Sequence, residues 1–150
     1  MRLSLRSTFT RTFFVIPALV GVEQVISRRP VRPIWLLLMA WGFAQHYLVG
    51  RYRSSRGGGG PGLRTPPDRL VVTGPFAVTR NPMFLGHLVY LVGLAKFTSS
   101  PFAAAAVVLN FPWYERRTQL DEANLEQMFG EDYREYMARV PRWLSCRERK

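Results

Sequence analysis

Two short clusters of polar residues in this chain carry side chains suited to chemistry. The first is Arg80-Asn81-Pro82, which follows the turn residues Gly74-Pro75 and leads into an apolar run. The second is Arg117, Asp121 and Glu122, within a charged segment that has helical spacing. Arg117 and Asp121 are one helical turn apart, which predicts an ion pair. From spacing alone, a solvated helix face explains this second cluster better than a binding site does.

The first cluster marks the start of a helix. Proline is favoured at the first helical position because its missing N–H would have no partner there. A helix is therefore expected to begin at Pro82. Asn81 then takes the N-cap position, where its amide side chain lies beside the unpaired N–H groups of the first turn.

Several other kinds of chemistry find no support in the sequence. The chain has no Gly-x-Ser-x-Gly nucleophile motif, and His46 and His87 are its only histidines. Cys146 is the single cysteine, so neither an internal disulfide nor a cysteine-based metal site is expected. The glycine run 57–60 lacks the Lys-Ser/Thr of a phosphate-binding loop and is interpreted as a linker. No metal site is predicted.

Four apolar stretches supply the elements that must position these residues. They are residues 12–27, 34–50, 83–97 and 101–114, with a tight turn expected between the last two. A helix needs about 20 mostly apolar residues to cross a bilayer, and only the second stretch approaches this length without counting polar members. A soluble domain with buried core helices is therefore one interpretation. A small multi-span membrane protein is the interpretation that we favour.

The distribution of charge favours the membrane interpretation. The 150 residues carry a net charge of +11, and the basic excess lies in the part that also holds the apolar stretches. This is typical of arginines in the loops of a membrane protein and argues against a nucleic-acid binder. The arginine-rich segment 51–80 is predicted to be a flexible cytoplasmic loop. The hairpin that follows it then returns the C-terminus to the cytoplasm.

The C-terminal residues 115–144 predict amphipathic helices. One is expected to end at Gly130, and a second fits residues 131–140 and is stopped by Pro141. An aromatic stripe on these helices is expected to pack against the protein, with a cofactor floor or an interfacial anchor as alternatives. Its members are Phe129, Tyr133, Tyr136, Val140 and Trp143. The predicted fold is one all-α domain, 1–150: an integral membrane bundle of about four spans with a cytoplasmic helical extension.

The segments that surround the two clusters resemble a known family. LVVTGPFAVTRNPMFLG, residues 70–86, is similar to the first signature of the isoprenylcysteine carboxyl methyltransferase and phospholipid methyltransferase superfamily. The second signature of that superfamily is similar to RTQLDEANL, residues 117–125, followed by FGEDYREY and RVPRWL. The resemblance covers roughly residues 65–145, with both motifs in the expected order.

The resemblance implies a small membrane enzyme that uses S-adenosylmethionine to methylate a lipophilic small-molecule or lipidated acceptor at the cytoplasmic face. It implies catalytic roles for Arg117 and Glu122. It implies a cofactor pocket formed by Gly74, Arg80, Asn81, Pro82, Phe84, Asp121, Glu122 and Tyr133. Methyl transfer from a sulfonium is an in-line displacement, so the residues of the protein would align the reactants and exclude water.

Two alternatives remain open at this point. Asp121 stands where the signature has glutamate, and Phe76 and Phe84 stand where tyrosines are usual. These departures suggest a non-catalytic membrane protein that keeps the fold. The other alternative is a phospholipid N-methyltransferase, because the sequence does not identify the acceptor. The oligomeric state is equally open.

Overall fold

The structure is a computed structural model that describes residues 7–60 and 65–144. All regular structure in these residues is helical, which confirms the predicted all-α class. The chain divides into two compact units. Unit 1 consists of Met1–Ala44 and Gly86–Glu115, and unit 2 consists of Gln45–Leu85 and Arg116–Lys150. Cys146 and its neighbours lie outside the described residues.

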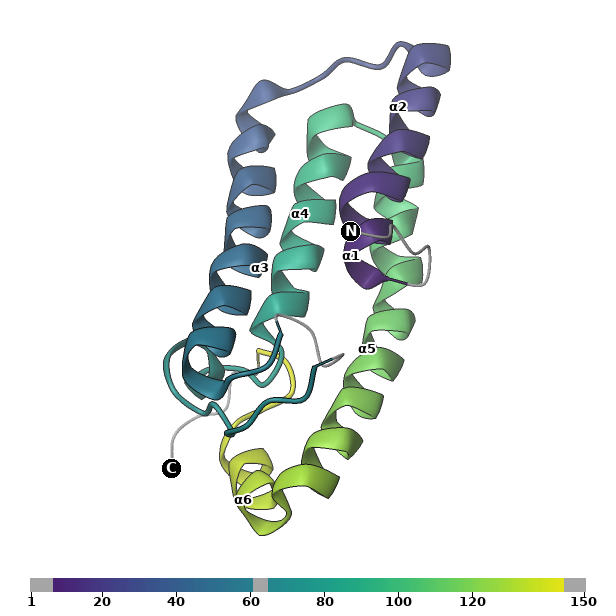
Figure 1. Ribbon diagram of the computed structural model, residues 1–150. Coiled ribbons are helices and arrows are strands. Elements are labelled where there is room, and N and C mark those ends of the chain that lie inside the picture. The colour runs from purple at the N-terminus through teal and green to yellow at the C-terminus, as the bar shows by residue number, and fades with distance from the viewer. Residues whose placement is uncertain (1–6, 61–64, 145–150) are drawn as a thin grey trace, which may run out of the picture. The chain divides into compact units, whose positions relative to one another are not determined.

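Unit 1 begins with a helix that runs from residue 8 to residue 27 in three parts: α1 (Thr8–Thr10), the π-helical η1 (Arg11–Val15) and α2 (Ile16–Ser27) (Figure 1). Two side-chain contacts join this helix to α5 (Pro101–Phe129). The Thr12 and Tyr114 hydroxyls lie 2.6 Å apart. Arg11 donates a 2.8 Å hydrogen bond to Asn110. Polar side-chain contacts thus hold the first helix against α5.

The α4–α5 hairpin turns as tightly as the sequence predicts. Helix α4 (Pro82–Thr98) and α5 are separated by Ser99 and Ser100 alone (Figure 1). Ser99 takes up the reversal with a left-handed backbone, at φ 50°. The Ser100 hydroxyl accepts a 2.9 Å hydrogen bond from the Ala103 N–H, so a side chain satisfies one donor of the first turn of α5.

In unit 1, α3 (Leu36–Gly57) and α4 approach each other through glycines. A Cβ built on Gly42 would lie 2.5 Å from the backbone nitrogen of Tyr90 and 2.7 Å from the Gly86 carbonyl oxygen. A Cβ on Gly93 would lie 2.8 Å from the Met39 backbone nitrogen. These helices therefore pack backbone against backbone, as small residues allow in membrane helix pairs.

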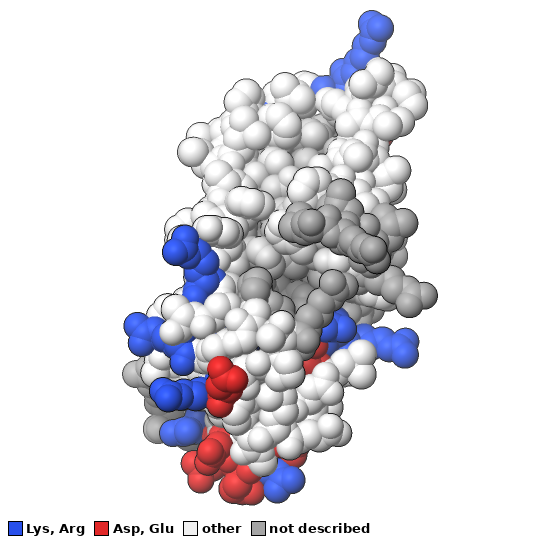
Figure 2. Space-filling model, in the orientation of Figure 1, with Lys and Arg blue, Asp and Glu red and all other residues white. Residues whose placement is uncertain are grey.

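Large apolar side chains lie exposed on the helices of unit 1. Those exposed by 60% or more are Val25, Ile26, Ile34, Leu37, Trp41, Val108 and Leu109. On the face shown in Figure 2 these helices present a mostly uncharged surface, whereas acidic side chains gather over α6 (Glu131–Arg139) and the adjoining end of α5. Many large exposed apolar side chains on one unit are typical of a membrane or protein interface.

Within the described residues, one helix is long and apolar enough to cross a membrane, and it is Thr8–Ser27. The sequence pointed instead to 34–50 as the clearest span. Helix α3 is less apolar than a membrane-crossing helix, because Gln45 and His46 lie within it and it continues into Arg51 and Arg53. Pro82–Thr98 is apolar but shorter.

In unit 2, the first residues of the predicted loop 51–80 are helical. Helix α3 continues to Gly57, seven residues into the expected loop. Arg56 stacks over the Tyr52 ring at 4.4 Å and lies in the last turn, where a cation is favoured by the helix dipole. Gly58, at φ 70°, ends the helix. The Gly57 carbonyl then accepts hydrogen bonds from the Asp68 and Arg69 N–H groups, so the loop folds back onto the helix end.

The C-terminal helices lie close to their predicted bounds. Helix α5 runs without interruption through Pro112 to Phe129, so residues 115–129 extend the helix of the fourth apolar stretch. Pro112 removes one backbone hydrogen bond, and the helix continues because its other bonds remain. Gly130, at φ 53°, ends α5 as predicted, and α6 ends one residue before the predicted Val140.

Packing of the aromatic stripe gives unit 2 its core. Tyr133 and Tyr136 are 1% and 3% exposed and pack with Val49, Phe76 and Val140. The Tyr136 hydroxyl donates a 2.7 Å hydrogen bond to the Phe76 carbonyl, which lies in the short helix η3 (Gly74–Ala77). The packing interpretation of the stripe is thus confirmed for these residues. The core fixes α6 against the loop that leads into α4.

Candidate functional site

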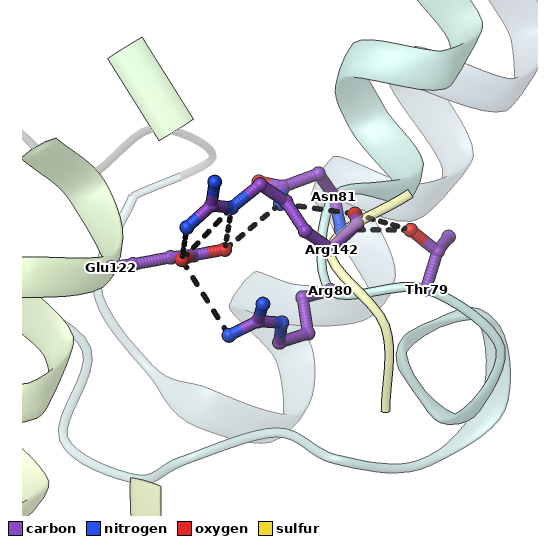
Figure 3. Close-up of polar contacts among 5 residues, drawn as sticks. All are labelled: Thr79, Arg80, Asn81, Glu122 and Arg142. Atoms are coloured by element: carbon purple, nitrogen blue, oxygen red, sulfur yellow. Dashed lines mark hydrogen bonds and ion pairs between the residues drawn. The ribbon is translucent and has the colours of Figure 1, made fainter. Parts of the chain in front are cut away.

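A buried carboxylate, Glu122, is the centre of the candidate site in unit 2. Glu122 is 6% exposed. Arg142 binds it with two donors: Nη2 lies 2.8 Å from Oε2, and Nε lies 3.1 Å from both oxygens. Arg80 Nη1 lies 3.5 Å from Oε2, and the Asn81 amide donates to Oε1 at 3.4 Å. Figure 3 shows these side chains converging on Glu122 from two other segments of the chain.

Asn81 reaches Glu122 because of the way α4 begins. The Asn81 carbonyl accepts a 3.2 Å hydrogen bond from the Leu85 N–H, so Asn81 holds the N-cap position and the predicted start at Pro82 is confirmed. The Asn81 side-chain amide donates to Glu122 and, at 3.3 Å, to the Arg142 carbonyl. The cap residue therefore links the start of α4 to α5 and to the C-terminal segment.

Hydrogen bonds to the backbone carbonyls of Pro141 and Arg142 hold Arg142 at the site. The Thr79 hydroxyl donates to the Arg142 carbonyl at 2.8 Å, and the Arg80 N–H donates to the Pro141 carbonyl at 3.0 Å. The same hydroxyl accepts a 3.3 Å hydrogen bond from the Asn81 N–H (Figure 3). Residues 79–81 and 141–142 thus lie directly against each other.

The sequence did not select Arg142 or Thr79 as site residues. Arg142 stands within the Arg-Val-Pro-Arg part of the second signature, and Thr79 stands directly before Arg80. Both lie within signature segments, although only Thr79 is adjacent to a selected residue. Proximity to a motif was therefore the available signal, but it does not show which neighbours point inward.

Asp121 faces different partners from Glu122, although the two residues are adjacent. Arg117 Nη2 lies 3.0 Å from Asp121 Oδ1, which confirms the predicted ion pair. The Arg117 side chain is 44% exposed and that of Asp121 is 16% exposed. Burial raises the pKa of Asp121, and the positive charges of Arg117 and Arg53 oppose this shift. Arg53 was missed because its segment was predicted to be a loop.

Tyr133 joins the Glu122 cluster through Arg80. Its hydroxyl forms a side-chain hydrogen bond with Arg80. Burial, with a smaller contribution from the Glu122 charge, raises the pKa of Tyr133 well above its ordinary value. The phenol is therefore neutral at physiological pH and adds no charge to the cluster.

The remaining predicted site residues lie around this cluster rather than in it. Gly74 adopts φ 59°, and a Cβ there would lie 2.6 Å from the Tyr52 hydroxyl oxygen. The Pro82 carbonyl accepts a 2.9 Å hydrogen bond from Gln45. Phe84 is half-buried in the first turn of α4. The structure thus brings together Arg80, Asn81, Glu122 and Tyr133, and it places Arg117 with Asp121.

Among the residues that the structure describes, no group of three or more His, Cys, Asp or Glu side chains is placed to hold a metal ion. The adjacent acids Asp121 and Glu122 each have arginine partners instead. The arrangement can bind charged organic groups through arginine and amide donors.

Comparisons with known proteins identify relatives of this chain. It is 34% identical over 79 residues to protein-S-isoprenylcysteine O-methyltransferase B of Arabidopsis thaliana. This match covers 52% of this chain and 40% of that protein. It is 32% identical over 76 residues to the human protein-S-isoprenylcysteine O-methyltransferase. This second match covers 50% of this chain and 27% of that protein. The matched segments thus span well under half of these relatives.

No protein-family model matches the chain, and no solved structure matches it significantly. The matches to isoprenylcysteine O-methyltransferases extend to mouse and rice proteins at 30% and 29% identity. They agree with the resemblance that the two signatures carry. Over about half of its length, the chain is thus similar to isoprenylcysteine O-methyltransferases.

Proposed function

We propose that this chain is a membrane methyltransferase that uses S-adenosylmethionine to methylate the carboxylate of a lipophilic acceptor such as a prenylated cysteine. The observation that carries the proposal is the contact of Asn81 with Glu122. It joins the two signature segments, within one unit, through residues that are 41 positions apart in the sequence. The names of the relatives favour O-methylation over phospholipid N-methylation.

The residues present suit the amino-acid end of S-adenosylmethionine. Buried guanidinium and amide donors are the groups that recognise a carboxylate. Arg80 Nε is buried and has no hydrogen-bond partner within the described part of the chain, so this donor is available to a ligand. We assign Gly74, Arg80, Asn81, Pro82, Phe84, Asp121, Glu122 and Tyr133 to the surroundings of the cofactor.

S-adenosylmethionine, when bound, supplies an activated methyl group, so the chain itself need not supply a nucleophile. The task of the protein is to orient the acceptor and to exclude water, and alignment of this kind contributes about 7–11 kcal/mol. Arg117 is half-exposed and suits the orientation of an acceptor carboxylate through two parallel hydrogen bonds. Asp121 holds the Arg117 guanidinium in place.

The apolar surface of unit 1 supports a membrane setting for this reaction. We propose that the protein crosses the membrane several times and that the C-terminus lies in the cytoplasm. A lipophilic acceptor would then approach from the bilayer. Membrane lipids would be the surroundings of the protein as well as the route of its acceptor.

The test uses the purified chain in detergent. Wild-type protein is expected to bind S-adenosylhomocysteine and to transfer labelled methyl from S-adenosylmethionine to N-acetyl-S-farnesylcysteine. Asn81→Ala is expected to weaken binding of S-adenosylhomocysteine about tenfold, because the variant loses the buried amide that donates to the Glu122 carboxylate. Asn124→Ala is the matched control, since Asn124 is exposed on α5. Wild-type protein that neither binds nor transfers would exclude the function.

A further inference from the structure

The cluster around Glu122 holds more positive than negative charge. Arg80 and Arg142 share the single carboxylate of Glu122, so the three side chains together carry one net positive charge. The side chains of Arg80 and Glu122 are only 10% and 8% exposed, and that of Arg142 is 31% exposed. Since water screens buried charge weakly, the unbalanced charge favours the binding of an anion.

One donor in this cluster lacks an acceptor. Arg80 Nε is buried and makes no hydrogen bond to the residues that the structure describes. A buried donor without a partner is unfavourable, and an acceptor on a ligand would relieve this. The side chain of Arg80 is nine-tenths buried and already reaches Glu122 through Nη1 and Tyr133 through a hydrogen bond. The side chain is therefore fixed in place before any ligand arrives.

The chain holds Arg142 equally firmly. Its carbonyl accepts hydrogen bonds from the Thr79 hydroxyl and the Asn81 amide, and its guanidinium is bound to both oxygens of Glu122. Glu122 thus acts as a shared counter-ion that positions two guanidinium groups. Its own oxygens are occupied by cations and an amide of the same chain, which makes it a poor receptor for an additional ammonium group.

We propose that Arg80 and Arg142, positioned by Glu122, form a binding site for a carboxylate. Guanidinium groups recognise carboxylates through parallel hydrogen bonds, and two of them around one counter-ion leave one positive charge for the ligand. The inference rests on the proposed function for the source of that carboxylate. Either the amino-acid end of S-adenosylmethionine or the carboxylate of a prenylated cysteine supplies it.

The experiment compares ligands with and without a carboxylate on the full-length chain in detergent. One pair is S-adenosylhomocysteine and 5′-methylthioadenosine, which lacks the amino-acid end. The other pair is N-acetyl-S-farnesylcysteine and its carboxamide. Dissociation constants are measured for wild type, Arg142→Gln, Arg142→Lys and the control Arg139→Gln. Arg139 is exposed on α6, so its substitution removes the same charge away from the site.

Arg142→Gln is expected to weaken binding of one carboxylate-bearing ligand about tenfold while leaving its partner ligand unchanged. Weakened S-adenosylhomocysteine binding identifies the cofactor as the source. Weakened N-acetyl-S-farnesylcysteine binding identifies the acceptor. Arg142→Lys keeps the charge opposite Glu122 and is expected to show a smaller loss, because an ammonium cannot form the bidentate contact. Arg139→Gln is expected to bind as wild type does.

Three outcomes would overturn the inference. In the first, Arg142→Gln and Arg142→Lys, both folded by their thermal transitions, bind all four ligands as wild type does. In the second, they weaken both members of a pair equally. In the third, S-adenosylhomocysteine binds more tightly, which would mean that Arg142 blocks Glu122 rather than binding the ligand. If wild-type protein binds none of the ligands and transfers no methyl group, the proposed function itself is wrong. The inference is then wrong as well, because it rests on that function.

Discussion

Glu122 and Asp121 show how neighbouring acids on one helix take different parts in a site. Glu122 is buried between two arginines and an amide, whereas Asp121 pairs with a half-exposed arginine one turn away. Successive residues on a helix point in directions about 100° apart, so adjacent acids face different surroundings. At the residue scale, the acidic doublet therefore supplies two separate ion-pair clusters.

Substitution of Glu122 tests how much its cluster stabilises unit 2. Glu122→Gln leaves Arg80 and Arg142 without a counter-charge in a mostly buried setting, and removal of one partner from a buried pair costs about 3–5 kcal/mol. The measurement is chemical unfolding in detergent, followed by circular dichroism.

The matched control for that measurement is Glu126→Gln. Glu126 pairs with Arg134 at 2.8 Å, but their side chains are 38% and 59% exposed. Surface pairs of this kind contribute about 0–1 kcal/mol. Equal losses of unfolding free energy in the two variants would contradict a buried, cooperative cluster at Glu122.

At the scale of elements, glycines decide how the helices of unit 1 pack. Gly42 lies against the backbone of α4 at Tyr90 and Gly86, where a side chain has no room. Gly21, in α2, has nothing within 4 Å of its Cβ position. Gly42 thus allows two helix backbones to approach closely, whereas Gly21 has no such role.

Gly42→Ala is expected to lower the free energy of unfolding by about 1–3 kcal/mol, because the added methyl group forces α3 and α4 apart. Gly21→Ala is expected to raise it by about 0.5–1 kcal/mol, since alanine loses less conformational entropy in a helix. Thermal unfolding of the two variants in the same detergent checks both signs. A Gly42→Ala protein as stable as wild type would show that the helices do not pack this closely.

At the scale of the whole molecule, the exposed apolar surface of unit 1 and the basic segments of the chain bear on how it lies in a membrane. Thr8–Ser27 satisfies the requirements for a membrane-crossing helix in length and apolarity. The arginine-rich segment 51–80 is of the kind that stays on the cytoplasmic side. The α4–α5 hairpin follows that segment, so its turn is expected on the opposite side from the C-terminus.

Cys146 allows this orientation to be measured, since it is the only cysteine of the chain. A membrane-impermeant maleimide is expected to label Cys146 in inverted vesicles and not in intact cells. Cys146→Ser combined with Ser99→Cys places the single thiol in the α4–α5 turn instead. That variant is expected to show the reverse pattern, and labelling of both proteins from the same side would exclude the proposed topology.

The sequence by itself determined the features that depend on local chemistry. Pro82 begins α4, Gly130 ends α5 and Pro141 follows α6, as steric rules for proline and glycine predict. The Arg117–Asp121 pair follows from helical spacing alone. The two signatures indicated a resemblance to isoprenylcysteine methyltransferases, and the relatives found by comparison are similar over about half of the chain.

Tertiary structure alone decided which charges meet. The extension of α3 through Arg53 and the insertion of Arg142 beside Glu122 depend on segments that are far apart in the sequence. From local patterns alone, Arg53 was predicted to lie in a loop because it follows an apolar run. Arg142, which follows Pro141, was given no role in the site. Packing brings both arginines close to carboxylates, because a guanidinium that is partly withdrawn from water needs a counter-charge, and only the packing of the helices determines which carboxylate lies within reach.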